Sequence, residues 1–302
     1  MATLKKYRNW EKLGKAAGGE KWFVVDGQAL YGSESMFASL PVNLICDECP
    51  VEKSSTELFH GYPVSSMDYP PYSCSGFTLK GVADYLPSPE MPEEVGWMNT
   101  VLFKDDALWV TDNELCLKVH MATEREHTVS FVIPRDVAKV LKSATSDTVA
   151  YYVDDTSVTF EFVDQSRFTF KKVENKWPDM ASWFGEWVNL PYMKEVTIDK
   201  IIAGIDRNGC KYVSFDAHNL RAADKDGNIF FSDPFVGIDL GNNDVITFPA
   251  KSLKKVMRLL KSADFGEFEP SFDARYYPFP ARFVLCDKFG RIVRGMLNCA
   301  GA

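Results

Sequence analysis

Basic residues recur at helical spacing in two separate stretches of this sequence. They occupy positions i, i+4 and i+7 in both: Arg135, Lys139 and Lys142, then Lys251, Lys255 and Arg258. Side chains with this spacing share one face of an α-helix. Such a face could hold phosphate oxygens through charge alone, without reading any sequence. The simpler alternative is an ordinary solvated helix face, and the spacing by itself leaves both interpretations open.

Other potentially reactive residues do not form a recognisable site. Cys46 and Cys49 form a C-x-x-C, but structural zinc usually takes four ligands and no second close pair is present. Residues 224–228 begin like a calcium loop, yet the glycine comes too early and the final glutamate is missing, so a hairpin turn is favoured. Neither a phosphate-binding glycine loop nor a nucleophile beside the histidines is present. We therefore predict no enzymatic activity, no metal and no cofactor.

The basic stretches belong to a longer repeat. Each follows a strand-like run and a proline, at Pro134 and Pro249, and each ends in Lys-Ser-Ala at an offset of 119 residues. Apolar residues occupy the opposite helical face in both copies: Val137, Val140, Leu141 and Ala144, then Leu253, Val256, Met257 and Leu260. The same offset aligns 77–86 with 196–205. After a shorter connector, 101–112 aligns with 213–224. A repeat of this length indicates duplicated domains.

Between the helices the pattern is that of strands. Residues 148–153 and 158–162 alternate around the turn-forming pair Asp154-Asp155, as antiparallel hairpins do. The first 70 residues resemble half of the repeat, with a basic helix stopped at Gly18-Gly19 and a hairpin turning at Asp26-Gly27. We predict an α+β fold with two helices per domain. The expected domains are a partial one at 1–71 and complete ones at 72–189 and 190–302.

Charge is segregated along the chain. The segments 5–15, 135–142 and 251–261 hold thirteen basic and two acidic residues, which leaves −19 for the rest of a chain whose total is −8. No apolar run is long enough for a membrane span. Seven cysteines, an odd number, fit a reducing compartment better than a disulfide framework. His120 and His127 flank a polar connector and are expected at the surface. We predict a cytoplasmic protein.

Together these features resemble the DNA sliding clamps, most closely the beta subunit of bacterial DNA polymerase III and its phage relatives. The residues that carry the resemblance are Val101–Asp112, Phe131–Pro134 with the helix that follows, Ser166–Phe170 and Trp177–Asp179. The resemblance implies a DNA-clamp fold of duplicated antiparallel sheets whose helices line a central channel. It also implies a processivity factor that encircles double-stranded DNA as a ring, with a DNA polymerase and a clamp loader as partners.

The resemblance also assigns the candidate site residues. The DNA-facing candidates are the basic residues of three helices: Arg135, Lys139, Lys142, Lys251, Lys254, Lys255, Arg258 and Lys261, with Lys5, Arg8 and Lys12 from the N-terminal helix. The family binds partner peptides in an apolar groove near its last strand, and the candidates for it are Met296, Leu297, Leu190 and Pro191. Apolar residues on a last strand are, as an alternative, simply core.

The chain departs from the family in offering two and a half domains. Bacterial clamps have three domains and close as dimers, whereas two-domain clamps close as trimers. The sequence therefore does not decide whether a ring forms or how many copies it contains. A clamp-fold protein that binds clamp partners as a decoy, without encircling DNA, is the alternative function. An enzyme on an all-strand scaffold is a third and weaker reading. The expected setting is the cytoplasm of a bacterium or of a phage-infected host cell.

Overall fold

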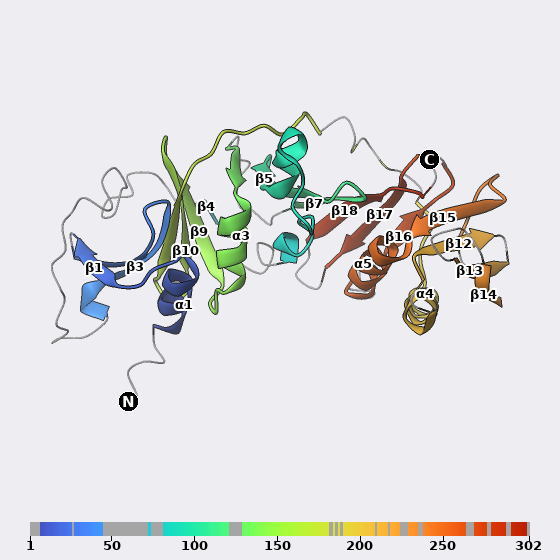
Figure 1. The fold of residues 1–302 in the computed structure, drawn as a ribbon, viewed down its shortest axis with the longest axis horizontal. Helices are drawn as coiled ribbons and strands as arrows, with labels where there is room; N and C mark the ends of the chain where they lie inside the picture. The colour runs from blue at the N-terminus through green and yellow to red at the C-terminus, as the bar shows by residue number, and fades with distance from the viewer. Residues whose placement is uncertain are drawn as a thin grey trace. The chain divides into compact units, whose positions relative to one another are not determined.

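The computed structural model of this chain divides into two compact units. It describes residues 7–300 with gaps at 26, 45–71, 74–80, 121–128, 181–183, 185–186, 188–189, 209, 217, 224–228, 235–237, 264–268, 277–278 and 288–290. Unit 1 comprises Met1–Val110 and Met121–Lys176, and unit 2 comprises Thr111–His120 and Trp177–Ala302. Both units combine antiparallel strands with helices (Figure 1).

Unit 1 takes its elements from both of its segments. Its α-helices are α1 (Arg8–Ala16) and α3 (Arg135–Lys142), and 3-10 helices cover Val42–Leu44 and Glu93–Asn99. Its strands are β1 (Trp22–Val25), β2 (Gln28–Gly32), β3 (Met36–Pro41), β4 (Tyr72–Ser73), β5 (Val101–Lys104), β6 (Ala107–Thr111), β8 (Phe131–Ile133), β9 (Thr148–Val153), β10 (Ser157–Phe162) and β11 (Arg167–Lys171).

One sheet of unit 1 joins residues far apart in the sequence. Its strand order is β1-β2-β3-β11-β10-β9-β4, and β3 pairs antiparallel with β11, with Phe37 opposite Thr169. The predicted N-terminal hairpin is confirmed by the pairing of Val25 with Gln28, while Asp26 of its predicted turn lies outside the described residues. The N-terminal hairpin therefore extends the sheet that follows α3. In the same unit β5 pairs with both β6 and β8.

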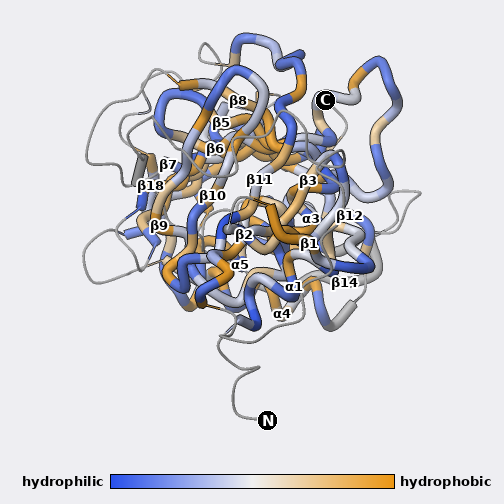
Figure 2. Tube along the Cα trace, turned by 90° about the vertical axis from the view of Figure 1, so that its left-hand side faces the viewer, coloured by the Kyte–Doolittle hydropathy of each residue, from blue (hydrophilic) through white to orange (hydrophobic). Residues whose placement is uncertain are grey.

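The core of unit 1 is rich in aromatic side chains. The rings of Phe103 and Phe131 stack with centroids 4.8 Å apart, and Tyr151 meets Phe103 edge to face at 5.1 Å. These rings are almost completely buried. Figure 2 shows the consequence along the chain, with strands β5 and β8 coloured as hydrophobic. Alternating strand residues thus supply the core, as the sequence pattern predicts.

Helix α1 packs its buried face on β2 and β3 and lies beside α3 (Figure 1). The Trp10 indole N–H donates to carbonyls of both strands at 3.2 Å. A Cβ on Gly14 would lie 2.4 Å from the Tyr31 ring, so this close approach requires glycine. The helix ends before Gly18, whose φ of +84° is left-handed, as the sequence predicts.

Unit 2 contains the second basic helix. Its α-helices are α4 (Glu195–Asn208) and α5 (Ala250–Lys261), which pack side by side (Figure 1). Its strands are β7 (Leu115–His120), β12 (Tyr212–Asp216), β13 (Asn219–Ala223), β14 (Ile229–Pro234), β15 (Val245–Pro249), β16 (Ser271–Asp273), β17 (Ala281–Cys286) and β18 (Ile292–Leu297).

The strands of unit 2 pair in two antiparallel groups. One has the order β14-β13-β12-β15 and the other β16-β17-β18-β7. The Phe248 ring of β15 meets the Phe272 ring of β16 edge to face at 5.9 Å, so the two groups share a core. Helix α5 contacts β15 and β18 and buries its apolar face completely, with Leu253, Val256, Met257 and Leu260 at 0% exposure.

The predicted repeat has equivalent elements in both copies. Segment 101–112 contains β5 and β6, and segment 213–224 contains β12 and β13. Each basic helix follows a short strand, β8 or β15, and begins directly after its proline. Residues 81–83 are helical, as is the aligned part of α4. The 119-residue offset therefore marks a structural duplication.

The predicted α+β class with duplicated antiparallel sheets is confirmed. The three domain boundaries, which would close at residues 71 and 189, stay a prediction. The C-x-x-C at Cys46 and Cys49 and the turn at 224–228 lie outside the described residues. Among the described helices, none has the length and apolar character that crossing a membrane requires.

Candidate DNA and partner interfaces

The basic residues of α3 lie beside carboxylates. The Arg135 guanidinium Nε is 2.9 Å from a Glu90 carboxylate oxygen, and the Lys139 ammonium is 3.5 Å from the same atom. Lys139 also pairs with Asp136 at 3.1 Å, and Lys142 pairs with Asp84 at 2.6 Å. All three candidates of this helix therefore have an acidic neighbour, which reduces the positive potential that they present.

Helix α5 divides its cations between two stripes. Lys254 and Lys261 pair with Asp206 and Asp199 of the neighbouring helix α4. Lys251, Lys255 and Arg258 form the other stripe, at positions i, i+4 and i+7. On this stripe Lys251 and Arg258 are exposed and have no ion pair with any described residue.

Lys255 differs from its neighbours because it anchors a turn. Its ammonium lies 2.7 Å from an Asp112 carboxylate oxygen, and the side chain of Asp112 is only 11% exposed. The other oxygen of that carboxylate accepts from the Leu115 amide at 2.8 Å. The Ser252 hydroxyl donates to Glu114 in the same turn. Lys255 thus holds α5 against the turn that precedes β7.

Helix α1 presents a third set of cations. Arg8 and Lys12 are exposed and have no ion pair within the described part of the chain, whereas Lys15 pairs with Glu11. Lys5 lies outside the described residues. Arg8, Lys12 and Lys15 repeat the i, i+4, i+7 spacing of the other two helices. The candidates that keep an unpaired cationic group are therefore Arg8, Lys12, Lys251 and Arg258.

The partner-groove candidates separate in the same way. Met296 is partly exposed on β18, whereas Leu297 is completely buried at 0% exposure and belongs to the core. Leu190 and Pro191 are half-buried beside β16, where the Phe272 amide donates to the Pro191 carbonyl at 3.0 Å. Leu297 therefore supports the strand, and of the two last-strand candidates Met296 is the one that a partner can touch.

Arg282 was not singled out by the sequence, yet it lies next to Met296. It occupies the position on β17 directly opposite Met296, and its guanidinium lies 5.7 Å from the ring centroids of both Trp187 and Tyr276. Within the described residues it forms no ion pair with a carboxylate. A strand arginine gives no sign in the sequence of which aromatic rings will flank it, so only the fold reveals this cluster.

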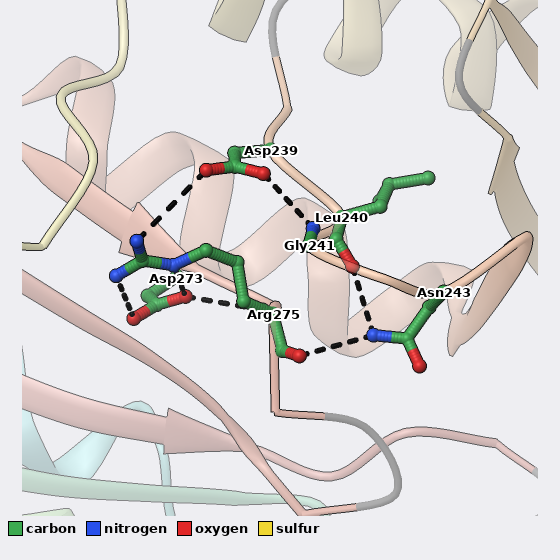
Figure 3. Close-up of polar contacts among 6 residues, drawn as sticks. All are labelled: Asp239, Leu240, Gly241, Asn243, Asp273 and Arg275. Carbon is green, nitrogen blue, oxygen red and sulfur yellow. Dashed lines mark hydrogen bonds and ion pairs between the residues drawn. The ribbon is translucent and has the colours of Figure 1, made fainter.

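A second arginine fixes the segment that carries Tyr276. Both carboxylate oxygens of Asp273 bind the Arg275 guanidinium, at 2.9 and 3.0 Å, and Arg275 also faces Asp239 (Figure 3). The Arg275 carbonyl accepts from the Asn243 side chain at 3.0 Å. Burial alone would raise the pKa of Asp273, but the bonds and charge of Arg275 outweigh it and hold that pKa below its usual value.

His120 is half-buried at the end of β7, which differs from its expected surface position. Burial, together with the charges of Lys118 and Arg294, lowers the pKa of its imidazole to about 4. Lys118 and Arg294 are directly opposite each other on β7 and β18. His120 is therefore neutral near pH 7 in a positive local field. Of the other histidines, His218 is exposed and His60 and His127 lie outside the described residues.

Comparison with known proteins rests on structure alone. No protein-family model matches the sequence, and no curated protein matches it. A DnaN sliding clamp from Bartonella birtlesii, bound to griselimycin, has a TM-score of 0.68 and 13% identity, with 99% of this chain and 98% of that chain covered. The DNA polymerase sliding clamp of Bacillus subtilis has a TM-score of 0.65 and 10% identity, with the same coverage. This chain has the sliding-clamp fold.

A further sliding-clamp structure, the Helicobacter pylori beta clamp bound to a DNA ligase peptide, has a TM-score of 0.58 and 11% identity. The match covers 91% of this chain and 76% of that chain. The predicted resemblance to the beta subunit of DNA polymerase III is thereby confirmed for the fold. Within the described residues of this clamp fold, no group of histidine, cysteine or carboxylate side chains is arranged to hold a metal ion.

Proposed function

We propose that this protein is a DNA polymerase processivity factor, a sliding clamp that encircles duplex DNA as a homo-oligomeric ring. The observation that carries the proposal is the clamp fold along nearly the whole chain, with 99% of its residues matched. A ring that travels along DNA needs contacts to phosphates and none to base edges. The exposed cations of α1 and α5 are suited to such exchangeable contacts.

The structure ranks the DNA-facing candidates. Lys251, Arg258, Arg8 and Lys12 support the proposal most directly, because their charges are not neutralised by a described carboxylate. Lys139, Lys142 and Lys261 are in exposed ion pairs, which are worth about 0–1 kcal/mol each and can exchange a carboxylate for a phosphate. Arg135, Lys254 and Lys255 are the least available, since their side chains are only 17%, 23% and 27% exposed.

The proposed partners are a replicative DNA polymerase and a clamp loader. The H. pylori clamp with its ligase peptide shows that a protein of this fold binds partner peptides. For this chain we propose Met296, Leu190 and Pro191 as the contact residues, with Leu297 supporting them from the core. The proposed role is non-enzymatic and needs no cofactor or metal. Its proposed setting is the cytoplasm of a bacterium or of a phage-infected host.

A second candidate function is supported by the ion pairs. Because carboxylates accompany every basic residue of α3, the helix is less attractive to DNA than its sequence indicates. A clamp-fold protein that occupies clamp partners without encircling DNA would tolerate this neutralisation. The two functions differ in whether a closed ring forms.

Retention on circular DNA tests the first proposal. The protein is loaded onto a nicked circular plasmid with a clamp loader and separated from free protein by gel filtration. We expect it to stay with the circle and to be released when the plasmid is linearised, because a ring slides off free ends. Release at the same rate from both forms would reject encirclement.

A further inference from the structure

The strands β7, β18, β17 and β16 of unit 2 have two unlike faces. The face toward α5 is apolar and buried, with Phe283 at 0% and Val293 at 5% exposure. The opposite face carries charge, because strand residues alternate between faces. Cross-strand pairing places Arg282 beside Met296, and Arg294 beside Lys118. We call Arg282, Arg294, Met296, Lys118 and His120 the Arg282–Arg294 face.

Two charges of this face lie around Met296, which shares the face with other apolar residues such as Val284 and Ile292. Arg282 is directly across from Met296 on the next strand, and Arg294 lies two residues before Met296 on the same strand. Both neighbours are within reach of a long side chain on the same face. Met296 is therefore flanked by a guanidinium on two sides. The rings of Trp187 and Tyr276 extend the apolar surface beyond Arg282.

Neither arginine of the face has an ion pair with a described carboxylate. Asp273 is directly opposite Arg282 in the sheet, and the charge of Arg282 helps to lower its pKa, but both of its carboxylate oxygens bind Arg275. Lys118 directly opposite Arg294 is a like-charge pair, which destabilises a sheet rather than supporting it. An acidic partner would bring carboxylates to both guanidinium groups of the face.

We infer that the Arg282–Arg294 face binds an acidic segment of a partner protein, in which carboxylates lie on either side of an apolar side chain. The apolar side chain would contact Met296 and Trp187, and the carboxylates would bind the two guanidinium groups. An extended peptide places alternate side chains on one face, which fits this spacing. The inference rests on the proposed function, because it gives the chemical class of the peptide for the groove at Met296.

A protein segment fits this face better than nucleic acid does. Phosphate recognition needs cations alone, whereas here a thioether and two aromatic rings lie between and beside the cations. The chain as a whole is acidic, with a net charge of −8, and would repel a long polyanion approaching the sheet. A short acidic segment with an apolar centre avoids that repulsion.

The test uses the full chain and a fluorescein-labelled synthetic peptide in which every second residue is serine and the residues between are, in order, glutamate, leucine, glutamate, phenylalanine and glutamate, so that an extended peptide carries the carboxylates and the apolar side chains on one face. The control peptide has the same sequence with glutamine in place of each glutamate. We expect the acidic peptide to bind at least about tenfold more tightly than the glutamine peptide, and Arg282→Glu with Arg294→Glu to weaken it by about tenfold or more. Added salt should weaken the acidic peptide only. Equal binding of both peptides would overturn the inference.

Two further variants separate this site from DNA binding. Lys211→Glu reverses an exposed charge elsewhere in unit 2 and should leave peptide binding unchanged. Lys251→Glu with Arg258→Glu should lose retention on circular DNA but keep the peptide, so a protein that fails only the DNA test leaves the inference intact. A loss of affinity for duplex DNA in the Arg282→Glu, Arg294→Glu variant, measured by fluorescence titration without a clamp loader and equal to its loss of peptide affinity, would instead make this face a nucleic-acid site and refute the inference.

Folding of the variants is checked with Arg294→Gln. Because Arg294 faces Lys118, this change removes a like-charge contact, and we expect a Tm equal to or above that of the wild type together with weaker peptide binding. A lower Tm would show that Arg294 is needed for the sheet and would count against a binding role. Met296→Ala should weaken both peptides, since it removes only apolar contact.

Discussion

One buried polar residue of helix α1, Asn9, links the helix to distant parts of unit 1. It is 2% exposed, and its side-chain amide donates to the Ser166 hydroxyl at 2.8 Å and to Asp164 at 3.5 Å. Its carbonyl oxygen accepts from the amides of Thr145 at 2.7 Å and Ser146 at 3.3 Å. Asn9 therefore ties the N-terminal helix to the segment after α3 and to the β10–β11 turn.

Replacing Asn9 should weaken unit 1. Asn9→Ala leaves buried hydrogen-bonding groups without partners, so we expect the free energy of unfolding to fall by roughly 2–3 kcal/mol. Urea denaturation, monitored by tryptophan fluorescence, measures the change in the free energy of unfolding. Lys12→Ala, an exposed change in the same helix, serves as the control and should cost little. Similar midpoints for the two variants would show that Asn9 does not anchor the helix.

The roles of single residues such as Asn9 could not be predicted from the sequence. The partners of Asn9 are between 136 and 157 positions away, and nothing local to α1 distinguishes Asn9 from a solvated polar residue. Arg282 was missed for the same reason, because its aromatic neighbours depend on sheet register and on the linker at Trp187. The sequence predicts Leu297 as a groove residue, but the alternation of side chains along β18 places it in the core, where it is completely buried.

At the scale of elements, the sequence was far more informative. Apolar periodicity and the proline starts correctly predicted α3 and α5, and alternation predicted the hairpins that follow α3. These features are local, so a window of the sequence contains them. Apart from Glu11 on α1 and Asp136 on α3, the carboxylates that pair with the basic helices come from other segments, such as Asp199 and Asp206 on α4, and packing decides which cation each one meets.

Helix α5 offers a direct test of this division. Lys251→Glu with Arg258→Glu and Lys254→Glu with Lys261→Glu change the net charge equally on one helix. We expect the first pair to reduce DNA affinity more strongly and to flatten its salt dependence, because each lost phosphate contact lowers the slope by about 0.9. The second pair should mainly lower the Tm, since it places glutamates beside Asp206 and Asp199.

Fluorescence titration of duplex DNA at several salt concentrations provides the measurement for both α5 variants. Lys211→Glu is the control for charge outside the helix. If the two double variants lost affinity to the same extent, the ion pairs with α4 would not shield Lys254 and Lys261, and all five cations of α5 would have to be treated alike.

At the scale of the whole molecule, the proposed ring requires self-association. The sliding clamps of B. birtlesii and B. subtilis match this chain over 98% of their own length. The repeat in the sequence nevertheless amounts to two and a half domains. The proposed ring is homo-oligomeric, so two or more copies must close around the duplex. The decoy alternative carries no such requirement, which makes the assembly state the property that separates the two.

We expect the purified protein to have the mass of a dimer or trimer of the 34.1 kDa chain when measured by light scattering after gel filtration. The measurement is repeated across a range of protein concentrations, because association follows mass action and a weak ring would dissociate on dilution. Lys211→Glu should leave the mass unchanged. A strict monomer at every concentration, combined with intact binding of the acidic peptide, would reject the ring and favour a clamp-fold protein that occupies clamp partners.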